Sequence, residues 1–212
     1  MFIENISLNR RQFLNGILST GAFVVASRIV SDDLLAQAPA NAAPVFNTKA
    51  DTAALHPSVY LGIEPDGTVF IVTHRSEMGT GIRTSLPLVA ADELDADWSK
   101  CRIEQGVGDT RYGDQNTDGS RSIRDFYDAF RVAGASARSM LVTAAAAQWS
   151  VPATEITVVN HEVVHAKSGK KAGFGTLVAA AAKLPVPSKD AVKFKAKAAW
   201  KFVGKEIGRA HV

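Results

Sequence analysis

Two loops that carry glycine and hydroxyl side chains, each directly before a predicted helix, are the strongest candidates for a chemical site. The first reads Glu77-Met78-Gly79-Thr80-Gly81 and the second reads Gly119-Ser120-Arg121-Ser122. The first turn of a helix offers unpaired backbone N–H groups and partial positive charge, and glycine lets a ligand approach the backbone. Serine hydroxyls and an arginine add hydrogen bonds to phosphate. Together the loops are predicted to hold a large anionic ligand.

Taken singly, each motif is more typical of helix capping than of a site. Neither loop is a Walker loop or a dinucleotide fingerprint, because the required lysine or third glycine is missing. Glu77 fits loop capping as well as acid–base chemistry. We predict no metal site, because His74, His161 and His165 lack the spacing of metal ligands. His161 and His165 flank a predicted hairpin turn and are expected at the surface.

The elements that must position these loops follow from the apolar pattern. Helix 82–98 and a long helix from about residue 122 to 149 follow the two loops, with a loop at 106–122 before the second. The acidic residues of the first helix, Asp92, Glu93, Asp95 and Asp97, are expected to face water. The other predicted elements are strands 59–63 and 68–72 around a tight turn, strand 101–105, hairpin strands 155–159 and 162–166, and a short helix 174–183.

This order predicts an α+β fold: mixed strands and hairpins packed against one long helix and one or two shorter ones. The chain has 212 residues, a formal net charge of +3 and 46% hydrophobic residues, which fits a folded core. Nucleic acid is not an expected partner, because the net charge is small and the one dense basic stretch, 189–205, is interrupted by Ala, Phe and Trp. The single cysteine, Cys101, excludes an iron–sulfur site within this chain and is predicted to be buried.

The sequence divides into four predicted regions. Residues 1–38 resemble a twin-arginine export signal, with Arg10-Arg11 followed by Phe13-Leu14 and a small-x-small site at 36–38. An attached amphipathic helix or membrane anchor is the alternative. Residues 39–57 are predicted to be a linker, 58–187 the binding domain, and 188–212 a basic extended tail that is solvated or contacts another subunit. The final Ile-Gly-Arg-Ala-His-Val is expected to be non-native, because it matches a translated sequencing adapter.

The ordered set of motifs resembles a known family. Residues 74–84, the acidic segment 91–98 and the loop 119–122 are similar to the molybdopterin-binding large subunit of the xanthine dehydrogenase/aldehyde oxidase family, especially its isoquinoline 1-oxidoreductase beta subunits. The similarity covers most of residues 5–187. In that family the first loop usually reads Glu-Met-Gly-Gln-Gly, and the glutamine contacts the molybdenum end of the cofactor. This chain has Thr80 there, so that contact is lost, made through water or made elsewhere.

The resemblance implies that Gly79, Thr80 and Gly81 form one cofactor loop, and that Gly119, Ser120, Arg121 and Ser122 surround the pterin and its phosphates. It implies molybdopterin, with the cytosine dinucleotide form as one option, and hydroxylation of an N-heteroaromatic or aldehyde substrate. Electrons would pass to a small alpha subunit with [2Fe-2S] clusters.

Two further expectations follow from the resemblance. Large subunits of that family are several times longer, so the chain is expected to be a partial domain of a larger subunit. The general-base glutamate is expected outside this fragment, which leaves no catalytic residue within it and predicts that the fragment alone is inactive. The twin-arginine export machinery is an expected partner, and the expected location is periplasmic or membrane-associated. The alternatives are an exported, non-enzymatic anion-binding module and an interaction domain without ligand.

Overall fold

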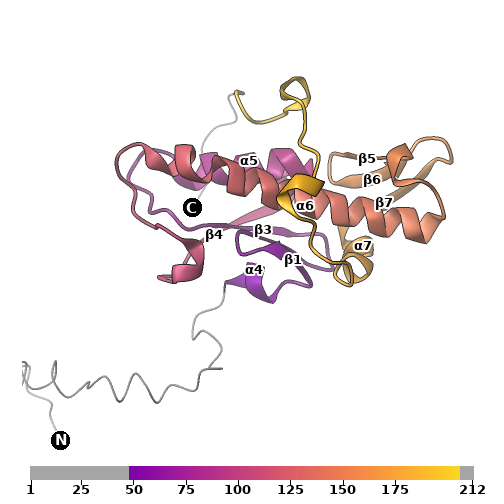
Figure 1. Ribbon diagram of the computed structural model, residues 1–212, viewed down its shortest axis with the longest axis horizontal. Coiled ribbons are helices and arrows are strands. Elements are labelled where there is room, and N and C mark those ends of the chain that lie inside the picture. Colours follow the sequence, from indigo (N-terminus) through magenta and orange to yellow (C-terminus); the bar gives the residue numbers. More distant parts are fainter. Residues whose placement is uncertain (1–47, 206–212) are drawn as a thin grey trace, which may run out of the picture. The chain divides into compact units, whose positions relative to one another are not determined.

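The computed structural model describes residues 48–205, which fold into two small sheets and four α-helices (Figure 1). This confirms the predicted α+β class. Short 3-10 turns occupy several of the connections. The α-helices and strands are α4 (Lys49–Thr52), β1 (Leu55–Ser58), β2 (Leu61–Ile63), β3 (Val69–Thr73), α5 (Ile82–Leu94), β4 (Cys101–Gln105), α6 (Arg121–Trp149), β5 (Ile156–Val159), β6 (Glu162–His165), β7 (Lys170–Gly173) and α7 (Phe174–Ala181).

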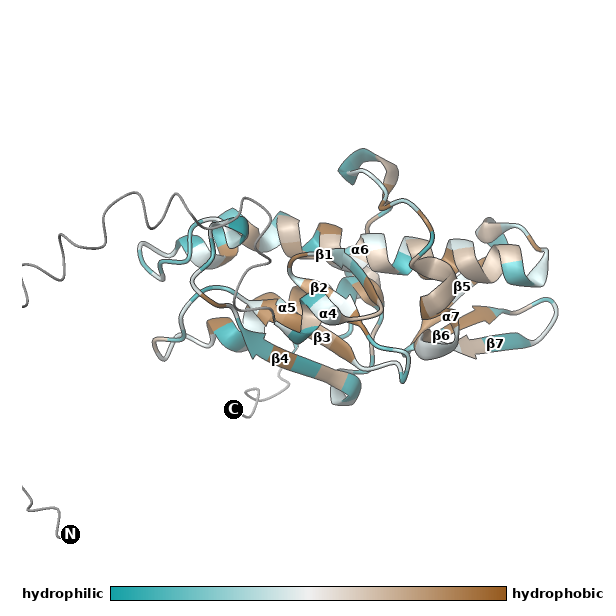
Figure 2. Cartoon of the chain, turned by 90° about the horizontal axis from the view of Figure 1, so that it is seen from below, coloured by the Kyte–Doolittle hydropathy of each residue, from teal (hydrophilic) through white to brown (hydrophobic). Residues whose placement is uncertain are grey.

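The first sheet has the strand order β1-β2-β3-β4 and leads directly into the first candidate loop. Strands β2 and β3 are antiparallel and joined by the predicted turn, where Gly67 has φ of 93° and Asp66 accepts the Thr68 N–H at 2.8 Å. Strand β4 is parallel to β3, with α5 as the crossover between them. Figure 2 shows mostly apolar residues along β3 and mostly hydrophilic residues along the edge strand β4.

The second sheet contains the predicted hairpin of β5 and β6 and adds a third antiparallel strand, β7, which the sequence did not predict. The hairpin turns at Asn160 and His161, both with positive φ. The expectation that His161 and His165 lie at the surface is wrong, because only 3% and 4% of them is exposed. His161 packs on Phe174 and its Nε2 lies 2.9 Å from the Gly67 carbonyl, so it connects the two sheets.

Helices α5 and α6 pack closely against each other, and both begin at candidate loops. A side chain at Gly134 of α6 would place its Cβ 2.4 Å from the Ala90 carbonyl of α5, so glycine permits this close approach. Helix α5 ends at Leu94 rather than at 98, because Asp95 adopts a left-handed conformation with φ of 63°. Cys101 is buried, as predicted.

The predicted linker at 39–57 extends too far, because its described part is folded. Residues 48–52 form a capped α4, in which the Asp51 carboxylate accepts hydrogen bonds from the Thr48 N–H and hydroxyl, each at 2.8 Å. Ala50 and Leu55 are buried at 1% and 2% exposure. The domain therefore begins at or before residue 48. The predicted export signal, residues 1–38, and the final residues 206–212 lie outside the described residues.

The acidic residues of α5 are the clearest departure from the sequence analysis. Asp92, Glu93 and Asp95 do not face water; they are exposed by 1%, 2% and 9%. The tail folds back over them, and the Asp92 carboxylate accepts the backbone N–H groups of Lys201, Phe202 and Val203 at 2.9, 3.1 and 2.9 Å. The tail is thus neither wholly solvated nor outside the domain.

Candidate functional site

The first loop, residues 74–81, connects β3 to α5 and uses its own acidic side chain as a helix cap. The Glu77 carboxylate accepts the Gly81 N–H at 3.0 Å and the Arg83 N–H at 3.1 Å. These backbone hydrogen bonds lower the pKa of Glu77. The predicted backbone cradle at 79–81 is therefore already occupied by a carboxylate of the same chain. An external anion would meet negative charge at this helix start.

The second loop adopts the backbone that its composition predicts. Gly119 and Ser120 both have positive φ, at 52° and 54°, and α6 begins at Arg121. The Arg121 guanidinium pairs with Asp118 at 2.7 Å and with Asp114 at 3.3 Å, so it is already neutralised. The hydrogen bond to Asp118 is the main reason that the pKa of Arg121 is raised. Phosphate binding by Arg121 would require release of these aspartates.

The two loops nevertheless meet at one cavity of about 390 Å³. Both loops and both helix starts contribute to its wall, which is rich in hydroxyl groups. The lining residues are Thr80, Ile82, Ser85, Thr117, Asp118, Gly119, Ser120, Ser122 and Ile123. Of the predicted site residues, Thr80, Gly119, Ser120 and Ser122 line this cavity, whereas Gly79, Gly81 and Arg121 do not. The two loops meet at one cavity, as the sequence predicted. Hydroxyl groups line this cavity, in place of the free backbone amides that were predicted for the first loop.

Two residues at the root of the first loop were not predicted as part of the site. His74 and Arg75 are exposed by 1% and 0%. The His74 ring packs against Tyr60 and Phe126, at centroid distances of 5.1 and 4.2 Å, and neither ring nitrogen has a hydrogen-bond partner within residues 48–205. Burial and then the charge of Arg75 lower the pKa of His74 to about 4, so it is neutral. Two polar residues directly after a strand do not indicate burial, so the sequence alone could not predict their place in the site.

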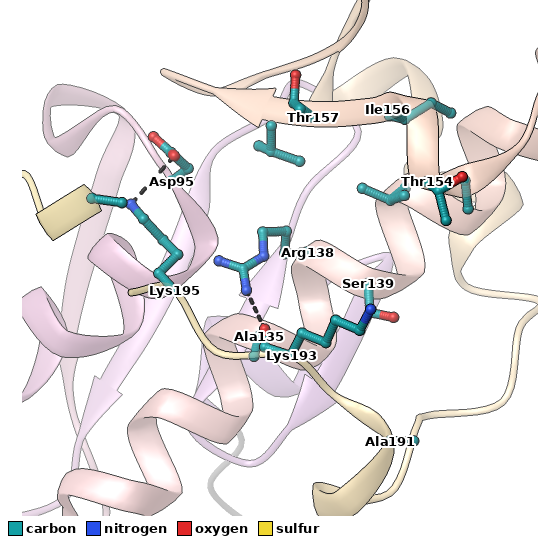
Figure 3. A pocket seen from close by; sticks show the side chains of 14 residues that line it. Asp95, Ala135, Arg138, Ser139, Thr154, Ile156, Thr157, Ala191, Lys193 and Lys195 are labelled. Atoms are coloured by element: carbon teal, nitrogen blue, oxygen red, sulfur yellow. Dashed lines mark hydrogen bonds and ion pairs between the residues drawn. The ribbon is translucent and has the colours of Figure 1, made fainter. Parts of the chain in front are cut away.

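A larger cavity of about 640 Å³ lies between α6, residues 153–158 and the tail (Figure 3). It shares no lining residue with the hydroxyl-lined cavity. Two of its three basic side chains are engaged by the protein. Arg138 donates to Glu93 and to the Lys193 carbonyl, and Lys195 pairs with Asp95 at 3.3 Å. These contacts hold the tail in place, so the hydroxyl-lined cavity is the better candidate for a ligand.

The fold and the cavity define a segment of a ligand-binding α+β domain, in which two packed helices start at one polar pocket. Residues 36–210 match the family described as "Molybdopterin cofactor-binding domain". The chain belongs to this family, as the resemblance of its motifs predicted.

Comparison with curated proteins gives the same assignment. The chain is 38% identical over 183 residues to isoquinoline 1-oxidoreductase subunit beta of Brevundimonas diminuta. It is 34% identical over 176 residues to a protein of Gluconacetobacter polyoxogenes named membrane-bound aldehyde dehydrogenase [pyrroloquinoline-quinone]. Each alignment covers 83% of this chain but 22% of the relative, so the chain spans about a fifth of their length.

Among solved structures, reconstituted CO dehydrogenase from Oligotropha carboxidovorans aligns with a TM-score of 0.50 and 24% identity. The alignment covers 57% of this chain and 15% of that chain, and it supports the fold alone. Within residues 48–205, no helix is long and apolar enough to span a membrane.

Proposed function

We propose that the hydroxyl-lined cavity holds part of a molybdopterin cofactor, and that the full-length protein is the large subunit of a molybdenum hydroxylase. Its proposed substrate is an N-heteroaromatic compound or an aldehyde, in keeping with the names of the two curated relatives. The observation that carries the proposal is that Thr80, Ser120 and Ser122, from two loops far apart in sequence, line one cavity in a chain of the molybdopterin-binding family.

The lining fits the chemistry of a phosphorylated pterin. Five of the nine lining residues carry hydroxyl groups, and a hydroxyl both donates and accepts hydrogen bonds. Ser120 and Ser122 lie at the start of α6, where the helix favours negative charge such as phosphate. Asp118 suits the N–H edge of the ring system, and Ile82 and Ile123 offer apolar walls to its faces. A volume of about 390 Å³ lies within the range of small-molecule sites.

When bound, the cofactor supplies the metal centre for a two-electron oxidation that inserts oxygen from water into a C–H bond. The described residues of this chain bind and orient the cofactor. The only carboxylate in the cavity wall, Asp118, pairs with Arg121 at 2.7 Å, so we assign it no proton transfer. Thr80 lies at the cavity wall, and its short hydroxyl is proposed to reach the cofactor through water where a glutamine would contact it directly.

The wider assembly follows from the same proposal. Electrons are proposed to pass to a small alpha subunit with [2Fe-2S] clusters, in keeping with the family resemblance and with the name of a relative as a subunit beta. The cytosine dinucleotide form of the cofactor and export through the twin-arginine machinery to the periplasm or membrane are further parts of the proposal. Arg10 and Arg11 support the export route.

Cofactor analysis of the full-length protein, purified with its partner subunits, tests this function. We expect molybdenum and a releasable fluorescent pterin in comparable molar amounts. Because one relative is named for pyrroloquinoline quinone, the same extract is assayed for that quinone. Quinone without molybdenum, or phosphate binding without any metal, would contradict the proposal. The second outcome would favour an exported anion-binding module.

A matched pair of serine variants tests the site itself. Ser120→Gly removes a lining hydroxyl, and glycine accepts the positive φ of 54° at this position. Ser150→Gly is the control, because Ser150 has φ of 56° at the opposite end of α6 and does not line the cavity. We expect Ser120→Gly to lower pterin content and Ser150→Gly to leave it unchanged. Equal pterin content in both variants would exclude Ser120 from the site.

A further inference from the structure

Arg75 is the largest fully buried side chain of the described residues, at 0% exposure. A buried guanidinium is costly unless hydrogen bonds and opposite charges compensate it. Arg75 belongs to the root of the first loop, yet its partners among the described residues belong to the segment 114–122 and the first turns of α6. The burial of Arg75 therefore has to be explained by the contact that it makes between the two loops.

The guanidinium contacts the chain at intervals from residue 114 to residue 126. Its Nη1 donates to the Asp114 carbonyl at 2.6 Å and its Nε donates to the Ser122 hydroxyl at 3.0 Å. The Asp118 carboxylate lies 4.0 Å from Nη2, and the Phe126 ring centre lies 5.3 Å from Cζ. These four partners are spaced four residues apart, so one planar side chain fixes the course of the loop into the helix.

Neighbouring residues strengthen the same junction. The Thr117 hydroxyl donates to the Ser76 carbonyl at 2.7 Å, and the Gln115 amide approaches the His74 carbonyl at 3.4 Å. Three consecutive residues, 74–76, thus bind the segment 114–122. Thr117, Asp118 and Ser122 line the cavity, so this junction forms the support behind its wall.

The hydrogen bond to Ser122 has a chemical consequence. Arginine can only donate hydrogen bonds, so the Ser122 oxygen must act as the acceptor towards Arg75. No other hydrogen bond of the Ser122 side chain occurs within residues 48–205. Its own O–H is therefore available to donate, and the bond from a charged donor polarises it further.

We propose that Arg75 is a positioning residue: it fixes the separation of the two loops and orients the Ser122 hydroxyl to donate to an acceptor oxygen of the ligand in the cavity. This inference rests on the proposed function for the identity of that ligand. The ligand atom that faces Ser122 is then a phosphate or carbonyl oxygen rather than an N–H group. The planar, forked geometry of arginine is required, and lysine would reproduce it only in part.

The test measures how fast the pterin leaves the loaded, full-length protein with its partner subunits, for wild type, Arg75→Met, Arg75→Lys, Ser122→Ala and the double variant Arg75→Met/Ser122→Ala. Arg111→Lys is the control, because Arg111 also anchors the long loop, through Asp51 at 2.7 Å and Asp109 at 3.2 Å, but does not line the cavity. The melting temperature is recorded separately for each variant.

We expect release to accelerate by about tenfold in Ser122→Ala, the value of one charge-assisted hydrogen bond. Arg75→Met should release faster still, because it also removes the contacts that fix the separation of the two loops, and Arg75→Lys should be intermediate. The double variant should match Arg75→Met, because without Arg75 the Ser122 hydroxyl is no longer oriented towards the ligand. Arg111→Lys should release pterin at the wild-type rate. If Arg75→Met does not fold, Ser122→Ala and Arg75→Lys still decide the question.

Two results overturn the inference. One is a folded Ser122→Ala or Arg75→Met protein that retains pterin as wild type does. The other is faster release in Arg111→Lys to the same extent as in Arg75→Lys, which would make the effect one of general loop stability. These results leave the proposed function intact, since the wild-type protein is loaded in both. Absence of pterin from the wild-type protein overturns the proposed function and this inference together.

Discussion

Two buried ionic clusters hold this domain together, and they are built with opposite polarity. In the loop junction, the cation Arg75 is buried at 0% side-chain exposure, while its acidic partners Asp114 and Asp118 are exposed by 39% and 59%. In the tail cluster, the anions are buried: Asp92 and Glu93 have 2% side-chain exposure, and cations from α6 and the tail surround them.

The clusters also differ in how completely their buried groups are bonded. Both Glu93 carboxylate oxygens are paired, with Arg131 and Arg138 at 3.1 Å each, and Asp92 accepts three backbone N–H groups. In the loop junction, Nη2 of Arg75 and both ring nitrogens of His74 have no hydrogen-bond partner among residues 48–205. Buried polar groups that have all their hydrogen-bond partners indicate a structural role. Buried polar groups that lack partners are typical of sites that act on a ligand.

The largest effect is expected from breaking the tail cluster. Glu93→Gln removes the charge that faces Arg131 and Arg138, and we expect the free energy of unfolding to fall by about 3 kcal/mol, as for other buried pairs that lose one partner. Urea denaturation of the purified chain measures it. Glu162→Gln, an exposed strand position, is the control and should change stability by less than about 0.5 kcal/mol. Equal effects of the two variants would show that the tail cluster is not structural.

A smaller effect is expected at the loop junction, and it depends on pH. The pKa of His74 is lowered to about 4, mainly by burial, so below its ordinary value of about 6.5 the unfolded chain takes up a proton that the folded chain does not. Stability should therefore fall by about 2 kcal/mol between pH 7 and pH 5. His74→Phe should reduce this slope, and the part that remains is expected from His161, whose pKa is also lowered by burial. Urea midpoints measured across this range test it, and an unchanged slope in the variant would refute the assignment.

The tail cluster should respond only at lower pH. Burial raises the pKa of Asp92, but the backbone N–H groups of Lys201, Val203 and Phe202, together with Lys195, outweigh burial and lower it overall. A lowered folded pKa means that the contribution of Asp92 is present above the ordinary aspartate value of about 3.9 and is lost only as the pH falls below it. Acid should thus weaken the loop junction before it releases the tail.

This comparison shows what the sequence could and could not predict. Local chemistry was predictable: Asp66 and Gly67 define the hairpin turn, and the loops before α5 and α6 do meet at one cavity. The buried acids were not, because the partners of Asp92 lie 109–111 residues later in the chain. His161 was misplaced for the same reason, since its partner Gly67 is 94 residues away. Strand β7 was missed because Lys170–Gly173 lacks apolar alternation.

The first candidate loop illustrates a different limit. Glu77 was compatible with both capping and catalysis, and only the hydrogen bonds to the Gly81 and Arg83 N–H groups decide for capping. The sequence showed where two helix starts converge. It could not show whether their amides are free, because that depends on the rotamer of one side chain.

The smallest effect on stability, and the most specific effect on the site, is expected from Thr80→Gln. Thr80 is exposed and lines the cavity, so the free energy of unfolding should change by less than about 0.5 kcal/mol. A glutamine amide reaches further than the threonine hydroxyl and can replace a bridging water with a direct hydrogen bond to the cofactor. Pterin release from the loaded protein should therefore slow, while the pH dependence governed by His74 stays the same. Faster release would mean that the threonine hydroxyl itself makes the contact, and that the cavity of this chain is fitted to the shorter side chain.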